Sequence, residues 1–272
     1  MSPTDLPAPP RRPLGATRPR LASLRTIGAL VLREMSSTYG RSPGGYVWAI
    51  LEPALGLTLL VAIFALGFRT PPLGSNFAIF YASGLLPFFV FTTTVAKVQQ
   101  AVNYSRQLLG YPRVTFLDAI LARFALNLLT QLSICAILFA VIFATGETRT
   151  VLRPGPLLNA FSMAAALGLG MGTVNCLLIS RQPIWNTVWA VVSRPLVLVS
   201  GVIILHESVP QPYRAWLEWN PLVHVTGEAR HAFYYSYHAD YVSSAYVYGV
   251  AGAMTVIGLL FLRRYTRDLL ER

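Results

Sequence analysis

The sequence predicts an all-α integral membrane protein with six transmembrane helices and both termini in the cytoplasm. Of its 272 residues, 54% are hydrophobic and only 12% are charged, whereas a soluble domain carries about 25% charged residues. Its mean hydropathy is +0.52, and several apolar stretches reach the roughly 20 residues that cross a bilayer. This composition excludes an ordinary soluble enzyme, a disordered chain and a disulfide-stabilised scaffold.

The first 40 residues precede any membrane span. Residues 1–20 contain six prolines and four arginines and no apolar run, which predicts a disordered cytoplasmic tail rather than a signal peptide. Residues 21–40 form an amphipathic helix too polar to span, which we expect to lie in the membrane interface. Docking to a partner protein is the alternative for this helix. Its apolar face carries Leu24, Ile27, Val31 and Met35.

The transmembrane domain is expected over residues 41–263, with a cytoplasmic tail at 264–272. In the fourth span, three glycines of the stretch LGLGMGT permit close helix packing. The fifth span is interrupted at Arg194 and Pro195. The six expected spans cover residues 46–68, 77–95, 117–145, 157–179, 184–205 and 242–262.

The basic residues indicate the orientation of the chain. With the N terminus inside, 17 of the 22 lysine and arginine residues fall on the cytoplasmic side and 5 outside. Basic residues accumulate in cytoplasmic loops, so both ends are predicted to be inside. The net charge of +11 therefore reflects topology, and no nucleic-acid partner is expected.

Two connecting segments are predicted to be structured. Residues 97–118 contain a polar stretch, two leucines, and then Gly110 and Pro112, which predicts a short cytoplasmic helix stopped by Gly and Pro. Residues 206–240 contain two helical stretches separated at Asn220, expected to enter the outer interface as re-entrant half-helices. Ten aromatic residues lie between residues 206 and 248. They fit an interfacial aromatic belt, and a sugar-stacking surface is the alternative left open.

Motifs for ATP binding and for zinc-dependent hydrolysis are absent from the sequence. Its single lysine, Lys97, is followed by valine, so the phosphate-binding motif GxxxxGK[ST] is missing, and HExxH does not occur. All four histidines lie between residues 206 and 238; a zinc site needs converging ligands, so interfacial histidines are the expected interpretation and no metal ligand is expected. Glu52 is the one acid deep in a span, with packing and translocation both open as its role. The chain is therefore not expected to be an enzyme, and no catalytic residue is assigned.

An ordered series of motifs resembles permeases of the ABC-2 class. Over about residues 21–272 the chain looks like the inner-membrane permease of capsular polysaccharide exporters, and the WNPL and SRPL stretches favour this branch over O-antigen export. The motifs are YGRSPGGYVWAILEP (39–53), RQLLGYPRVTFLDAILAR (106–123), ALGLGMGTVNCLLISR (166–181), SRPLVLVSGVIILHESVP (193–210) and WNPLVHVTGEARHAFYYSYHADYVS (219–243).

The resemblance implies a half-transporter in the bacterial inner membrane. Two copies of this chain would form the path, and two copies of a separate cytoplasmic ABC ATPase subunit would hold ATP and Mg, with no cofactor on this chain. The amphipathic helix and the first cytoplasmic loop would couple to that ATPase. The residues expected to do so are Arg33, Glu34, Gln100, Asn103, Arg106, Leu108 and Leu109.

The resemblance also implies a substrate path for a lipid-linked glycan. Membrane lipids, a periplasmic polysaccharide co-polymerase and an outer-membrane export protein are the further partners expected. The canal would be lined from Arg41, Tyr46, Trp48, Glu52 and Arg194. A periplasmic lid would use Tyr213, Trp216, Trp219, Tyr234 and Tyr235.

Other functions are weighed against capsule export. An O-antigen or teichoic-acid type exporter permease is the nearest alternative. An ATP-independent channel or secondary transporter would use Glu52 to couple ions, but no inverted internal repeat supports it. A lipid-modifying membrane enzyme would need acids and histidines that are better placed in the spans.

Overall fold

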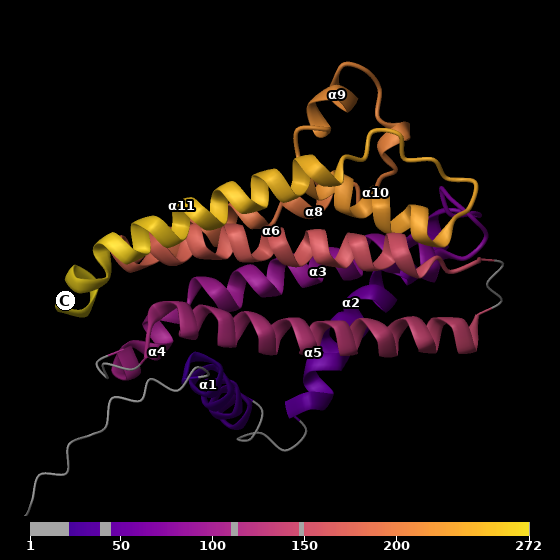
Figure 1. The fold of residues 1–272 in the computed structure, drawn as a ribbon. Helices are drawn as coiled ribbons and strands as arrows, with labels where there is room; N and C mark the ends of the chain where they lie inside the picture. Colours follow the sequence, from indigo (N-terminus) through magenta and orange to yellow (C-terminus); the bar gives the residue numbers. More distant parts are fainter. Residues whose placement is uncertain (1–21, 39–44, 110–113, 147–149, 272) are drawn as a thin grey trace, which may run out of the picture.

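The protein is a bundle of long helices in a computed structural model that describes residues 22–38, 45–109, 114–146 and 150–271 (Figure 1). Within these ranges the regular secondary structure is entirely helical. Among the described residues, five helices are long and apolar enough to cross a membrane, and they coincide with the first four and the last of the expected spans. These are α2 (Gly45–Gly67), α3 (Phe77–Gln99), α5 (Phe116–Thr145), α6 (Pro154–Arg181) and α11 (Ser244–Glu271).

The expected fifth span is not one helix. It consists of α7 (Ile184–Ser193) and α8 (Leu196–Val199), followed by turns. The interruption falls at Arg194 and Pro195 as predicted, because proline has no N–H to continue the helix. The ten residues of α7 rise about 15 Å, half of the roughly 30 Å hydrocarbon core. The count of six spanning helices is therefore not confirmed, and residues 184–205 are called the broken segment below.

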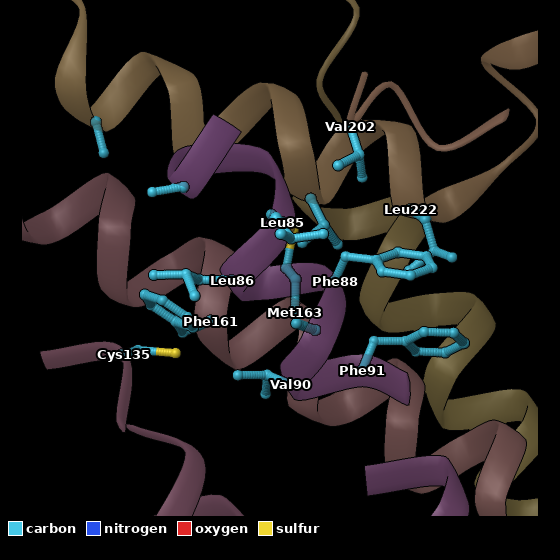
Figure 2. Close-up of a cluster of buried hydrophobic side chains, with 14 of the residues drawn as sticks. Leu85, Leu86, Phe88, Val90, Phe91, Cys135, Phe161, Met163, Val202 and Leu222 are labelled. Atoms are coloured by element: carbon cyan, nitrogen blue, oxygen red, sulfur yellow. The ribbon is translucent and has the colours of Figure 1, made fainter. Parts of the chain in front are cut away.

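Helix α3 forms the centre of the bundle. In the most apolar 18-residue stretch of α3, 78% of the residues are buried, against 11% for α2 and 22% for α11. Helices α2 and α11 therefore face outwards. Side chains of α3, α5, α6 and α10 (Pro221–Phe233) meet in one apolar cluster, which Figure 2 shows around Leu86 and Met163. Val202 of the broken segment joins this cluster beside Leu222 (Figure 2).

The glycines of α6 bring three helices together, as the sequence predicts. Gly168 and Gly172 lie against Thr94 and Val98 of α3, and Gly170 lies against the Ala251 carbonyl of α11. A Cβ built at Gly170 would be 2.7 Å from that carbonyl oxygen. Residues two apart on a helix point to different sides, so this short stretch serves both neighbours.

The short helices lie at the two ends of the bundle. Helix α1 (Ala22–Thr38), which confirms the helix expected at 21–40, packs on α5. Helix α4 (Ala101–Leu109) confirms the expected short helix after α3. In Figure 1, α1, α4 and the last turns of α11 lie towards one end of the bundle, whereas α9 (Tyr213–Leu217) projects beyond the start of α11, away from them.

The two helical stretches expected around Asn220 are present in the structure. The helical stretches separated at Asn220 are confirmed as α9 and α10. Asn220 caps α10 by accepting from the Leu222 N–H at 3.0 Å, and Pro221 occupies the first helical position. Most of α10 is buried through contacts with α3, α6 and α11, and its re-entrant placement stays a prediction.

Helix α11 continues to Glu271, through the residues expected as a C-terminal tail.

Gly170→Ala tests the close packing of α6 on α11. The new methyl group meets a backbone carbonyl that can move only if the helices separate, so we expect destabilisation by about 2 kcal/mol. Gly252→Ala is the control, because a Cβ there has nothing within 4 Å. The thermal unfolding midpoint in detergent measures both. Equal midpoints for the two variants would contradict the packing argument.

Candidate functional site

Polar side chains gather at two ends of the described bundle. The α4 end comprises α1, α4, the C-terminal turn of α3, the N-terminal half of α5, the C-terminal half of α6 and the start of α7. The α9 end comprises α9, α10, residues 199–208 and the stretch that leads into α11 (Figure 1). The two ends are described in turn.

A buried arginine joins four elements at the α4 end. Arg123 of α5 donates from Nη2 to Glu34 Oε1 of α1 at 2.8 Å, and both side chains are less than one-tenth exposed. Its Nη1 donates to the carbonyl oxygen of Lys97 at 3.2 Å, and its guanidinium lies 4.0 Å from the ring centroid of Tyr104 in α4. The ion pair therefore makes α1 a structural part of the bundle.

Helix α4 keeps one polar face exposed. It buries Val102 and Ser105 and exposes Asn103 and Arg106, with exposed Arg33 of α1 5.9 Å from the ring centroid of Tyr104. A shallow cavity of about 460 Å³ next to this face is lined by Ala96, Lys97, Gln100, Asn103, Tyr104 and Arg123. This face therefore presents polar side chains at the surface, next to the exposed guanidinium of Arg33.

A chain of amides connects the α3–α4 junction with α7. Buried Asn175 of α6 donates to Gln99 Oε1 at 3.3 Å and accepts from the indole Nε1–H of Trp185 at 3.0 Å. Gln100, between α3 and α4, donates to Asn186 Oδ1 at 3.4 Å. The start of α7 is thus attached to the residues from which α4 begins.

At the α9 end, α10 and its cap residue Asn220 hold the end of α8 and the turns that follow it. Asn220 Nδ2 donates to the Val199 carbonyl at 2.9 Å, Thr226 Oγ1 to the Ser200 carbonyl at 2.8 Å, and Arg230 Nη2 to the Val202 carbonyl at 3.0 Å. These three carbonyls follow the break in the helix and need partners wherever water is excluded.

Arg230 is the most completely buried charge in the described part of the chain, with 0% of its surface exposed. Its guanidinium lies 4.5 Å from the ring centroid of Phe80. No carboxylate of the described residues is within ion-pair distance, so the Val202 carbonyl and the aromatic ring are its main partners. Cation–π contact and a carbonyl acceptor partly replace the lost hydration.

A second buried group at the α9 end is His206, in the 3₁₀-helix η1 (His206–Ser208). Its ring lies 4.0 Å from that of Tyr241, and Glu218 Oε1 is 3.5 Å from its Nε2. Burial lowers the pKa of His206 below its ordinary 6.5, although Glu207 and Glu218 oppose the shift. The neutral imidazole is therefore favoured in the folded protein.

The structure does not gather the residues expected along a canal within one chain. Trp48 is 63% exposed and Glu52 is exposed on α2, which packs on α3 and α5. Arg194 is exposed after α7, which packs on α6. Arg41 lies outside the described residues, and only the backbone is described at Tyr46, as at Leu108 and Leu109 of α4. Their roles stay predictions.

The aromatic residues expected in a lid separate into two groups. Tyr213, Trp216, Trp219 and Tyr235 are exposed, and the rings of Tyr213 and Trp216 meet edge to face at 5.7 Å. Tyr234 is buried instead, with its ring against Gly74. Four of the five therefore remain available at the surface.

Sequence reasoning missed three residues that the structure makes central: Arg123, Asn175 and Arg230. In the sequence, Arg123 and Arg230 contribute only to the count of basic residues that sets the topology, Arg123 on the cytoplasmic side and Arg230 on the outer side. Asn175 lies in the apolar stretch TVNCLLIS, and a lone amide within a span is the signal that was available, because polar groups in a span need partners. Arg230 gave no signal of that kind, because its neighbours in sequence are polar as well as apolar.

These features define a polytopic α-helical membrane protein with an exposed polar face on α4 and exposed aromatic residues on and near α9. A family profile described as ABC-2 type transporter matches residues 25–234. The chain therefore belongs to the ABC-2 type transporter family, and it is an inner-membrane protein like the relatives described next.

Three relatives match the chain over nearly their whole length. Polysialic acid transport protein KpsM of Escherichia coli is 31% identical over 239 residues, 88% of this chain and 92% of KpsM. Capsule polysaccharide export inner-membrane protein CtrC of Neisseria meningitidis serogroup A is 25% identical over 249 residues, 91% and 93% of the two chains. The corresponding protein BexB of Haemophilus influenzae is 23% identical over 247 residues, 90% and 92%.

Glu34→Ala tests whether the ion pair holds α1 on the bundle. The variant leaves the Arg123 guanidinium buried without its carboxylate, and we expect a loss of about 3 kcal/mol. Thermal unfolding and the rate of proteolysis within α1 measure the effect. Adding Arg123→Met removes the stranded charge, so the double variant should recover part of the loss. Unchanged proteolysis in Glu34→Ala would show that the pair does not hold α1.

Acidification is expected to destabilise the α9 end through His206. Because the pKa of His206 is lower in the folded than in the unfolded protein, its contribution is complete above about pH 6.5 and is lost as the pH falls below that value. We expect the unfolding midpoint to drop between pH 8 and pH 5, and to drop less in His206→Phe. The same drop in both proteins would assign the pH dependence to other groups.

Proposed function

We propose that this chain is the permease subunit of an ATP-driven exporter that moves lipid-linked capsule polysaccharide across the inner membrane. The observation that carries the proposal is the similarity to proteins named for polysialic acid transport and capsule polysaccharide export, across 88% to 91% of this chain. An O-antigen or teichoic-acid type glycan is the alternative cargo.

The energy would come from a separate ABC ATPase that binds ATP and Mg. This chain has no phosphate-binding motif of its own. The exposed face of α4, with Asn103 and Arg106, and exposed Arg33 of α1 support a docking surface for that subunit. Glu34 would contribute indirectly, because it holds α1 in place through Arg123.

Two copies of the chain would form the path between them. Helices α2 and α7 each expose several large apolar side chains in the single chain, such as Leu55 and Leu59 on α2 and Val191 on α7, and exposed apolar faces support packing against a second copy. Trp48, Glu52 and Arg194 would then line the canal, with Arg41 and Tyr46 on the segment that enters α2. The broken segment would complete a sixth crossing, with both termini inside and α9 and α10 re-entrant from the outer face.

The α9 end would serve as the exit. Tyr213, Trp216 and Trp219 offer flat aromatic faces that suit the CH face of a pyranose, and such contacts tolerate different sugars. The arginines near the canal would attract a phosphate or sugar acid. A periplasmic co-polymerase and an outer-membrane export protein would receive the glycan from this end.

Purification of the tagged chain from its native membrane in mild detergent tests the proposal. We expect mass spectrometry to identify a P-loop ATPase at one-to-one stoichiometry and a lipid-linked glycan, whose sugars distinguish capsule from O-antigen or teichoic-acid cargo. Arg106→Glu, on the exposed face of α4, should reduce ATPase recovery about tenfold, since it reverses a charge at the interface. Arg69→Glu is the control, because Arg69 is exposed beyond the other end of α2.

Recovery of the chain alone, under conditions that preserve other ATPase complexes, would contradict the exporter. An ATP-independent channel or secondary transporter would then be the better explanation, and flux without ATP would establish it.

A further inference from the structure

The broken segment is held mainly at its ends. No side chain of α7 or α8 is fully buried, and Trp189, Leu196 and Val197 pack on the core while remaining partly exposed. Side-chain hydrogen bonds between this segment and other described elements fall into two groups, at residues 185–186 and at residues 199–202. A segment anchored in this way moves with its anchors.

The anchor at the α4 end belongs to the α3–α4 junction. Gln99 is the last residue of α3 and Gln100 precedes α4. Gln99 reaches α7 through Asn175 and Trp185, and Gln100 reaches it directly at Asn186. A displacement of α4 therefore acts on the start of α7 through two separate hydrogen-bonded contacts.

The anchor at the α9 end belongs to the outer helices. Asn220 lies between α9 and α10, and its side chain caps α10 at Leu222 while it donates to the Val199 carbonyl. Thr226 and Arg230 hold the next carbonyls of the segment. Gly201, with φ +71°, leaves room for Thr226, since a Cβ there would be 3.1 Å from Thr226 Oγ1. A shift of residues 199–202 therefore acts on the helix cap between α9 and α10.

We infer that the broken segment transmits displacement of α4 to α9 and α10, with Asn175 and Asn220 as the positioning residues at its two ends. The stiff helix α7 carries the movement, and the break at Arg194 and Pro195 lets it turn. The inference rests on the proposed function, because it needs an ATPase that displaces α4. It adds a route through which nucleotide binding on one side of the membrane changes the aromatic residues at the other.

The test measures movement of α9 in the complete complex with its ATPase. Tyr213 is 58% exposed on α9, and both native cysteines are buried, so a spin label on Tyr213→Cys marks α9 in each copy. We expect the distance between the two labels to change when ATP, Mg and vanadate are added to the complex in lipid vesicles.

Two matched pairs of variants identify the route. Trp185→Phe removes the indole donor to Asn175, whereas Trp189→Phe changes the same residue type on the same helix, at a side chain that makes no hydrogen bond to another described residue. Asn175→Leu is paired with Asn127→Leu, which removes a buried amide that bonds Thr94 outside the route. Loss of one hydrogen bond should lower the ratio of shifted to unshifted α9 about fivefold in Trp185→Phe, with ATP hydrolysis retained.

The outcomes separate the inference from the proposed function. If the distance between the labels in the unmodified complex does not change with nucleotide, the proposed coupling of ATP binding to α9 is contradicted, and the proposed route is contradicted with it. If that complex responds and Trp185→Phe responds equally, the route alone is overturned. If Asn175→Leu does not assemble, the comparison of Trp185→Phe with Trp189→Phe decides.

Discussion

Hydrocarbon supplies no hydrogen-bond partners, so every interruption of a membrane helix must be satisfied by the protein itself. The interruption after Arg194 leaves the carbonyls of Val199, Ser200 and Val202 to be paired, and Asn220, which caps α10, and Thr226 and Arg230 of α10 supply a donor for each. To reach them α10 lies inside the bundle, next to α3, α6 and α11. The burial of Arg230 follows from the same requirement, because its guanidinium must reach a carbonyl that lies over α3.

The two ends of the bundle use different chemistry for different purposes. At the α4 end, an ion pair connects α1 with α5, Arg123 stacks on Tyr104 of α4, and neutral amides connect the α3–α4 junction with α6 and α7. At the α9 end, side-chain donors meet backbone carbonyls. Between them the contacts are apolar, with small residues where α6 approaches its neighbours. An apolar middle with polar ends allows helices to tilt without leaving buried polar groups unpaired.

The outward surfaces explain how a chain of this size takes part in transport. Helix α3 and the neighbouring parts of α6 and α10 form an internal core, while α2 and α7 contribute little to it. Their exposed apolar faces are suited to lipid or to a second copy. Glu52 and Arg194 lie on these outward elements, where a carboxylate or guanidinium is stable only beside water or another polar group.

Much of the fold was accessible from the sequence because it depends on local pattern. Hydropathy located five helices that match the described spans, Gly and Pro marked the end of α4, Asn220 marked the start of α10, and Pro195 marked the break. The ordered motifs identified the family that the comparison establishes. The candidate site was predicted only in part, since exposed Asn103 and Arg106 fit a docking face while Glu34 and Tyr234 are buried.

By itself, then, the sequence determined which segments are apolar enough to span, where helices stop and which family the chain belongs to, because each of these is encoded in contiguous residues. Only the tertiary structure decided which polar groups pair. Arg123 and Glu34 are 89 residues apart in the chain, and Asn175 and Gln99 are 76 apart. Such partners are chosen by how helices pack, and the spacing of residues within any one helix carries no record of that choice.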